Sequence, residues 1–205
     1  MYWDWTLDWE HLERTPIFNS DPETGFGTDG DASGEITVGK TGRCVVDGAF
    51  NDIEASYYDV KKQPHCLSKG FRDDKGNLGT MDGRTISPES IDEVLSLDNY
   101  ERFVKEMEGR VHDTIPFGIG GDFETFTAPY DPLFYLHHTQ LDRLWWLWQQ
   151  QNPKERLSAY DGHNHRHSIE MASLDDEIDM RGLARNVQVR AVMDTEGDLL
   201  CYGYE

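Results

Sequence analysis

The sequence predicts a mainly α-helical protein, and three segments carry that prediction. Residues 88–96, 99–112 and 131–151 each follow a helix start signal and place apolar residues three or four positions apart. A strand-like alternation of apolar and polar residues occurs later, at 186–190. The expected fold is therefore helical, with long loops and short C-terminal strands.

Each predicted helix has its own start signal. Ser87 caps the first, and Pro88 suits its first turn because a backbone N–H there would have no partner. Asp98, with Glu101 three residues later, resembles a capping box for the second helix. Asp131 caps the third, which has the most regular helical pattern of the three.

Length and charge narrow the class of protein. The 205 residues suffice for a domain with a core, so residues 1–205 are expected to form a single domain. A net charge of −20 opposes binding to nucleic acid or to an anionic membrane. The most apolar segment, 133–148, contains charged residues and histidines, so we expect no membrane span. The N-terminus lacks the basic start and apolar run of a secretion signal.

Three cysteines allow at most one disulfide within the chain. They are Cys44, Cys66 and Cys201, and none lies in the Cys-x-x-Cys arrangement typical of zinc or redox sites. A bridge between Cys44 and Cys66 is the first pairing to test, and buried free thiols are the alternative. Residues 19–43, rich in Gly, Asp, Ser and Thr, predict an ordered loop or a tail.

Three of the eight histidines fall on predicted helices: His112, His137 and His138. Neighbouring helical residues point about 100° apart, so His137 and His138 cannot both face one site. His112 and one of the pair can converge, since the Gly-rich link at 118–121 lets their helices fold back antiparallel. Imidazoles from paired helices suit copper, zinc or iron. The histidine-rich patch at 163–167 is more typical of an exposed polar loop.

The neighbours of His138 favour a metal site. Asp142 follows one helical turn later and is placed to accept the ring N–H of His138, which would fix the tautomer of a ligand. The alternative is that Asp142 pairs with a surface cation such as Arg143, and that the aromatic residues on this face are simply core.

The string DPLFYLHHTQLDRLWWLWQ resembles the second-copper signature of tyrosinases, catechol oxidases and hemocyanins. In that signature, Asp-Pro-x-Phe-x-x-His-His is followed by an Asp-Arg pair. Further similarity surrounds it, in YWDWT, GFGTDGD, CVVDGAF, PHCLSKGF, GIGGDF and VMDTEGDLLCYGY. Together these segments cover nearly the whole chain, and they most resemble short fungal members of this family of type 3 copper proteins.

The resemblance implies a fold and an activity. Members of the family hold two coppers in a four-helix bundle, each copper bound by three histidines, and the two together bind O2. The implied reaction is the oxidation of phenols or catechols to quinones, with a small phenolic substrate and O2 as partners. If the chain follows its fungal relatives, it is secreted or vesicular.

The resemblance also implies roles for individual residues. His112 corresponds to the first ligand of the second copper and His138 to the third, with His137 as a non-ligating neighbour. Asp113 stands where the family has a residue that tunes activity. Glu108 corresponds to a glutamate that holds a water and helps to deprotonate the phenol, and helical spacing puts it on the same face as His112.

Two departures from the family pattern limit these implications. The second ligand belongs four residues after the first, where this chain has Pro116, which offers no donor atom to a metal. The first-copper histidines of the family precede YWDW, which here begins at Tyr2. We therefore expect a helical bundle without the first-copper helix pair, an N-terminally truncated domain that binds one copper or none.

Two hypotheses follow. The chain is the second-copper half of a copper oxidoreductase, or it is a non-catalytic relative that binds at most one metal ion or a phenolic ligand. A single copper(I) ion cannot supply both electrons that O2 accepts in this family. In either case the missing helices would leave apolar helix faces exposed, and a homo-oligomer is one way to cover them.

Overall fold

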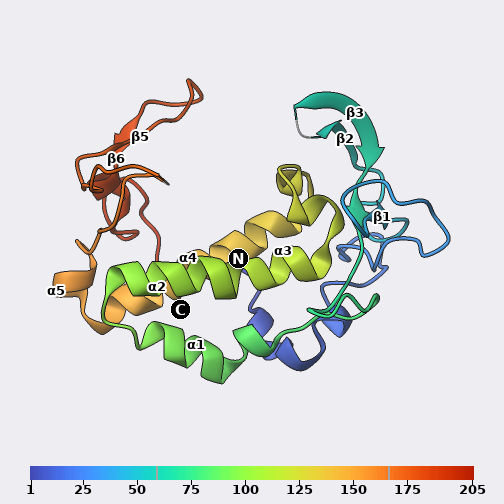
Figure 1. Cartoon of the computed structure of the whole chain (residues 1–205), viewed down its shortest axis with the longest axis horizontal. Helices are drawn as coiled ribbons and strands as arrows, with labels where there is room; N and C mark the ends of the chain where they lie inside the picture. The colour runs from blue at the N-terminus through green and yellow to red at the C-terminus, as the bar shows by residue number, and fades with distance from the viewer. Residues whose placement is uncertain (59, 166) are drawn as a thin grey trace. The chain divides into compact units, whose positions relative to one another are not determined.

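The structure is a computed structural model, and it describes residues 1–58, 60–165 and 167–205. The chain forms two compact units: a first unit of residues 1–92 and 108–141, and a second unit of residues 93–107 and 142–205. The α-helices are α1 (Pro88–Leu95), α2 (Tyr100–Glu106), α3 (Asp113–Ile119), α4 (Leu133–Gln151) and α5 (Pro153–Arg156), shown in Figure 1. The mainly helical fold is confirmed. None of the helices in the described ranges is long and apolar enough to cross a membrane.

Several predicted elements are present at their expected places. α1 and α4 match the helices predicted over 88–96 and 131–151. Asp131 caps α4, because its carboxylate accepts a hydrogen bond from the backbone N–H of Leu133 at 3.0 Å. The predicted strand at 186–190 corresponds to β6 (Val187–Gln188), which pairs antiparallel with β5 (Glu177–Ile178).

The helix predicted over 99–112 is longer than expected and changes character along its length. α2 is followed by a π-helical turn, η4 (Met107–His112), and then by α3, which contains Pro116. We expected the helix to end near residue 112, because the helical spacing of apolar residues ends at Val111. A proline inside a helix has no N–H for the carbonyl four residues earlier, and its ring crowds that carbonyl. Instead, the chain remains helical to Ile119. The π-helical turn directly before α3 has a wider hydrogen-bond pattern than an α-helix.

The first unit also contains strands that the sequence did not predict. β2 (Glu54–Tyr58) and β3 (Lys61–Cys66) form an antiparallel hairpin, and β1 (Arg43–Cys44) pairs antiparallel with β4 (Ser68–Lys69). Most side chains of the hairpin are exposed, so no alternation of apolar and polar residues marks it in the sequence. The disulfide between Cys44 and Cys66, one of two alternatives left open by the sequence, links β1 to the end of β3.

The N-terminal segment packs against the first half of α4. The backbone N–H of Trp3 donates to the carbonyl of Leu136 at 3.3 Å, and the amide of Gln140 donates to the Asp4 carboxylate at 3.0 Å. Trp5 lies in the core with no exposed surface. α3 and this half of α4 run in opposite directions, as predicted from the Gly-rich link between them (Figure 1).

A buried ion pair fixes the start of α4. The Lys69 ammonium lies 3.1 Å from the Asp131 carboxylate, and neither side chain has more than 1% of its surface exposed. The same ammonium donates to the carbonyl of Phe26 at 2.6 Å. Because a buried charge is stable only when it is paired and hydrogen-bonded, these contacts hold β4, the loop at residue 26 and α4 together.

The second unit is built around Trp148. Its ring stacks on Phe103 with centroids 4.5 Å apart, and its indole N–H donates to the carbonyl of Leu97 at 2.6 Å. The guanidinium of Arg156 lies 4.5 Å from the centre of the Trp148 ring and 3.0 Å from the Asp98 carboxylate. A cation over an indole adds attraction to the burial of both side chains. This unit therefore has an aromatic core of its own.

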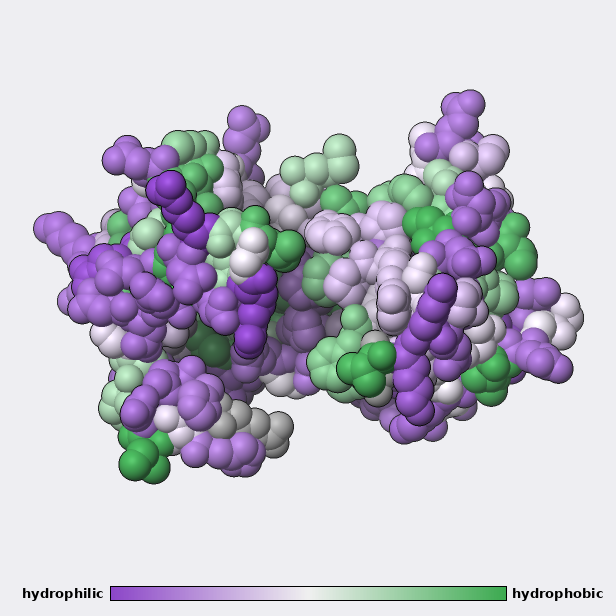
Figure 2. Space-filling view, turned by 90° about the horizontal axis from the view of Figure 1, so that it is seen from above, coloured by the Kyte–Doolittle hydropathy of each residue, from purple (hydrophilic) through white to green (hydrophobic). Residues whose placement is uncertain are grey.

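The molecular surface agrees with the acidic composition. Hydrophilic residues cover most of the face seen in Figure 2, and apolar residues appear on it in scattered patches. A net charge of −20 favours solubility.

Replacement of Lys69 by Met should destabilise the protein by about 3–5 kcal/mol, because the Asp131 carboxylate would stay buried without its counter-charge. Urea unfolding followed by circular dichroism measures this loss. The control is Lys75→Met on an exposed loop, which should change stability by less than about 0.5 kcal/mol. The double variant Lys69→Met with Asp131→Asn should recover part of the loss; an equal loss in both variants would mean that lost packing, and not the unpaired charge, is responsible.

Candidate functional site

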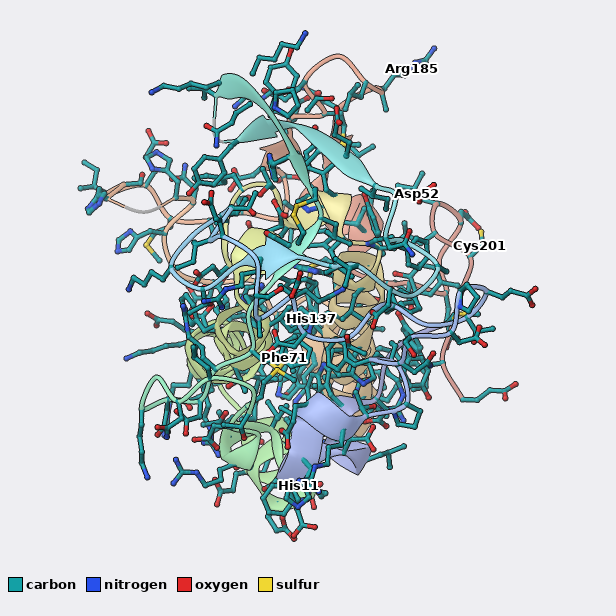
Figure 3. The ribbon with its side chains drawn as sticks, turned by 90° about the vertical axis from the view of Figure 1, so that its right-hand side faces the viewer. His11, Asp52, Phe71, His137, Arg185 and Cys201 are labelled. Carbon is teal, nitrogen blue, oxygen red and sulfur yellow. A yellow bond between two sulfur atoms is a disulfide. The ribbon has the colours of Figure 1, made fainter. Side chains whose placement is uncertain are left out.

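The three helical histidines meet inside the first unit. The ring centroids of His112 and His137 are 5.3 Å apart, those of His112 and His138 are 5.4 Å apart, and those of His137 and His138 are 5.2 Å apart. His112 ends the π-turn before α3, and the other two lie in α4. The convergence predicted from the antiparallel helices is present, and Figure 3 shows His137 in the interior.

His137 is held as a neutral, packed ring. It has no exposed surface, and the indole N–H of Trp5 donates to its Nδ1 at 3.2 Å. Burial, together with the nearby His138 and His112 rings, lowers its pKa well below the usual range. Its Nε2 is buried and has no hydrogen-bond partner. Because Nδ1 accepts from Trp5, the single proton of the neutral ring sits on Nε2, so neither nitrogen has a lone pair free for a metal.

His138 and His112 have the opposite tautomer. Nδ1 of His138 lies 2.9 Å from the carbonyl of Phe134, and Nδ1 of His112 lies 2.9 Å from the Asp113 carboxylate. Both partners are acceptors, so each Nδ1 carries the proton and each Nε2 keeps its lone pair. Burial lowers the pKa of His138, which favours its neutral form. These two rings therefore have the protonation that a metal ligand needs.

The predicted partner of His138 was wrong. Asp142 does not hold its ring N–H; the carbonyl of Phe134 does so from the preceding turn of α4. Asp142 instead accepts hydrogen bonds from the phenols of Tyr202, at 2.9 Å, and Tyr204. Burial and the contact with this carboxylate raise the pKa of Tyr202 to about 12. A residue of the same helix was the natural candidate, whereas the two tyrosines lie about 60 positions away in sequence.

A cavity of about 510 Å³ opens next to His112 and His138. Aromatic side chains form much of its lining, and the two histidines with two carboxylates supply polar groups, an arrangement typical of small-molecule sites. The residues that line it are Tyr58, His112, Asp113, Pro116, Phe117, Phe123, Glu124, Thr125, Phe126, Ala128, Phe134 and His138. Phe134 is the Phe of the Asp-Pro-x-Phe signature, and Phe123 belongs to the GIGGDF segment. The sequence did not point to the other aromatic residues of the lining.

The predicted site residues are not all brought together. His112, Asp113 and His138 line the cavity, and so does Pro116 at the position of the missing ligand. Glu108 lies exposed on the π-turn and is not part of the cavity lining. Instead, Glu124 supplies a second carboxylate there, where it pairs with Arg72. Of the histidine-rich patch at 163–167, Arg166 lies outside the described residues.

The donor set suits a partial copper site. His112 and His138 each offer an Nε2 lone pair, which copper accepts readily from imidazole. Pro116 offers no third donor. Within residues 1–58, 60–165 and 167–205, no group of three His, Cys, Asp or Glu side chains is arranged to hold a metal ion. The residues described therefore fit two of the three ligands of a copper and not the complete set.

Comparison with known proteins identifies the family. The family described as the common central domain of tyrosinase matches residues 1–151. The tyrosinase ustQ of Aspergillus flavus is 46% identical over 203 residues, which are 99% of this chain and 56% of that protein. The tyrosinase-like protein phomQ2 of Diaporthe leptostromiformis is 46% identical over 204 residues, or 51% of its length. The chain belongs to the tyrosinase family.

A solved structure supports the same conclusion. A point mutant of the polyphenol oxidase from Thermothelomyces thermophila superposes with a TM-score of 0.75 at 25% identity, over 100% of this chain and 65% of the other. The chain thus has an oxidase-type fold within an oxidoreductase family. It spans about half the length of the curated relatives it matches.

Replacement of Trp5 by Phe should destabilise the protein by about 1–3 kcal/mol, because buried Nδ1 of His137 would lose its donor. It should also release the tautomer of His137, which ¹⁵N chemical shifts of the ring report. The matched control is Trp146→Phe, whose indole N–H donates to Glu196 at the surface. An unchanged ¹⁵N pattern in Trp5→Phe would contradict the tautomer assigned to His137.

Proposed function

We propose that this chain is the second-copper part of a tyrosinase-like oxidoreductase that oxidises phenols or catechols to quinones with O2. The observation that carries the proposal is the matched pair of rings, His112 and His138, which both line one aromatic cavity and each hold their proton on Nδ1, so that Nε2 keeps its lone pair. The names of the relatives, tyrosinase and polyphenol oxidase, support the same reaction class.

In this proposal several residues of the cavity have defined tasks. His112 and His138 would hold the copper, which would supply one of the two electrons that O2 accepts. Asp113 keeps the proton of His112 on Nδ1 and so keeps Nε2 available. The rings of Phe117, Phe123 and their aromatic neighbours contact the two faces of a phenol and exclude water from it. Glu108, which lies outside the lining, has no part in this arrangement.

The remaining ligands come from outside the residues described. Pro116 removes the second ligand of this copper, and the chain spans only about half of its curated relatives. A complete two-copper site needs histidines that a longer protein or a second copy would supply. The proposed partners are therefore a small phenol, O2 and, for the chain in hand, a further copy that covers the apolar helix faces. We propose a secreted or vesicular location, in line with the fungal relatives.

The presence of Pro116 favours a second candidate function. A non-catalytic relative would keep the cavity for a phenolic ligand and would bind at most one metal ion. The two candidates differ in what the copper-free protein does: the non-catalytic relative binds a phenol such as 4-tert-butylcatechol without metal, whereas the oxidoreductase half needs copper for tight binding of the catechol oxygens.

Copper binding tests the ligand assignment. Titration of copper(I) against a chromophoric chelator should give at most one ion per chain. His112→Ala or His138→Ala should weaken binding by more than about 10- to 100-fold, the range expected for the loss of an outer partner alone. Asp113→Asn should fall within that range. Pro116→His should strengthen binding, because it places a third imidazole where the family has one.

The controls separate ligands from other histidines. His11→Ala alters an exposed ring and should leave copper affinity unchanged. Two copper ions per wild-type chain would overturn the half-site interpretation. No copper uptake by either the wild type or Pro116→His, with binding of the catechol retained, would favour the non-catalytic relative.

A further inference from the structure

His65 is a buried histidine whose two ring nitrogens both face acceptors. It lies in β3 with 3% of its side chain exposed. Nδ1 is 2.7 Å from the carbonyl of Gln63, and Nε2 is 2.9 Å from the carboxylate of Asp122. A neutral imidazole has one N–H and can satisfy only one of these acceptors. The geometry therefore corresponds to the imidazolium, with both nitrogens as donors.

The partner carboxylate is saturated with donors. Asp122 has no exposed surface, and it accepts from the backbone N–H of Ser68 at 2.9 Å, from the Ser68 hydroxyl at 2.8 Å and from the Thr127 hydroxyl at 2.6 Å. With His65 this makes two hydrogen bonds to each carboxylate oxygen. Such a group is stable as the ionised carboxylate. The pair is thus a buried ion pair that joins β3 and β4 to Asp122.

Asp122 lies in a turn that forms one side of the cavity. We call residues 121–128 the cavity wall, since Phe123, Glu124, Thr125, Phe126 and Ala128 all line the cavity. Gly121 starts this wall with φ of 58°, and an added Cβ there would lie 2.3 Å from the Ser68 carbonyl oxygen. The wall therefore packs directly on β4.

The His65 ring also lies beside Tyr58, another residue of the cavity lining. The Tyr58 ring meets the His65 ring edge-on with centroids 6.2 Å apart, and Tyr58 lines the cavity as well. Cys66, the next residue, is anchored to Cys44 by the disulfide. A fixed strand thus holds His65 between two parts of the cavity lining.

We propose that His65 is a positioning residue that, as an imidazolium, fastens the cavity wall and Tyr58 around the candidate site, and that its deprotonation loosens the wall as the pH rises. Among the described residues, the titratable groups that face its ring are Asp122, from η5 (Gly121–Glu124), and Tyr58, from β2. The effect of His65 on the cavity wall needs no copper, so it can be tested independently of the proposed function.

The direction of the pH effect follows from the contacts. Burial lowers the pKa of His65, but the hydrogen bonds to Gln63 and Asp122 and the charge of Asp122 outweigh it, so the pKa is raised. When the wall opens, the ring returns to an ordinary value near about 6.5. The contribution of His65 to closure is therefore fully present below about pH 6.5, and it is lost as the pH rises through the raised pKa of the closed form.

Nuclear magnetic resonance of the copper-free protein tests the proposal. The ¹⁵N shifts of His65 should titrate with a midpoint above about 6.5. Amide hydrogen exchange of the wall, at Phe123, Thr125 and Ala128, whose N–H groups bond to carbonyls within this turn region, should be followed over the same pH range. After correction for intrinsic exchange, their protection should fall about tenfold for each unit by which the midpoint exceeds the ordinary value.

Two variants make the test specific. His65→Gln keeps a neutral donor for Asp122 and should abolish this pH dependence, and Asp122→Asn should lower the His65 midpoint. His11→Gln, at an exposed ring, should change neither. If a variant does not fold, the ¹⁵N titration of His65 and the amide exchange of the wall in the wild-type protein still test the proposal. A His65 midpoint at or below 6.5, or wall protection that is independent of pH in the wild type, would overturn the proposal.

Discussion

The candidate site depends on the buried ion pair between Lys69 and Asp131. Asp131 has two roles at once: its carboxylate caps α4 through the N–H of Leu133, and it faces the ammonium of Lys69. A helix start held by solvated side chains could shift along its axis with little penalty. A start held by a desolvated charge pair has one favourable position, because any displacement leaves both charges buried and unpaired. His137 and His138 follow on the second turn of this helix, so the position of the helix start fixes their height and rotation.

Given that position, backbone and core groups assign the state of each ring before any ligand is present. The carbonyl of Phe134 accepts a hydrogen bond from Nδ1–H of His138. The indole N–H of Trp5 donates to Nδ1 of His137, so this nitrogen carries no proton. Two neighbouring residues of identical type thereby receive opposite tautomers. Their donors and acceptors distinguish them although both lie on the same helix with ring centroids 5.2 Å apart, and His137 is also the more deeply buried of the two. The N-terminal YWDW segment thus matters to the site although none of its residues lines the cavity.

Local signals in the sequence were sufficient for much of this arrangement. Capping residues and helical spacing located α1 and α4, and the antiparallel return of the chain predicted that His112 could converge with one of His137 and His138. The β2–β3 hairpin could not be found in this way because most of its side chains face water.

The partner of His138 was misassigned for a different reason. Spacing shows that Asp142 can reach one turn back along the helix, but not that Tyr202 and Tyr204 already occupy its carboxylate. The aromatic lining also arises from long-range packing, which no local pattern encodes.

Pro116 has two consequences: it removes a ligand that the family pattern has, and it changes the backbone of the helix that carries it. A residue with an N–H at this position can continue an ordinary α-helix from His112, and an imidazole there would face the same side as His112 one turn earlier. Proline removes both features together. The chain adopts a π-turn up to His112, and the pyrrolidine ring becomes part of the apolar lining. The cavity therefore loses a metal donor and gains hydrophobic surface at the same point.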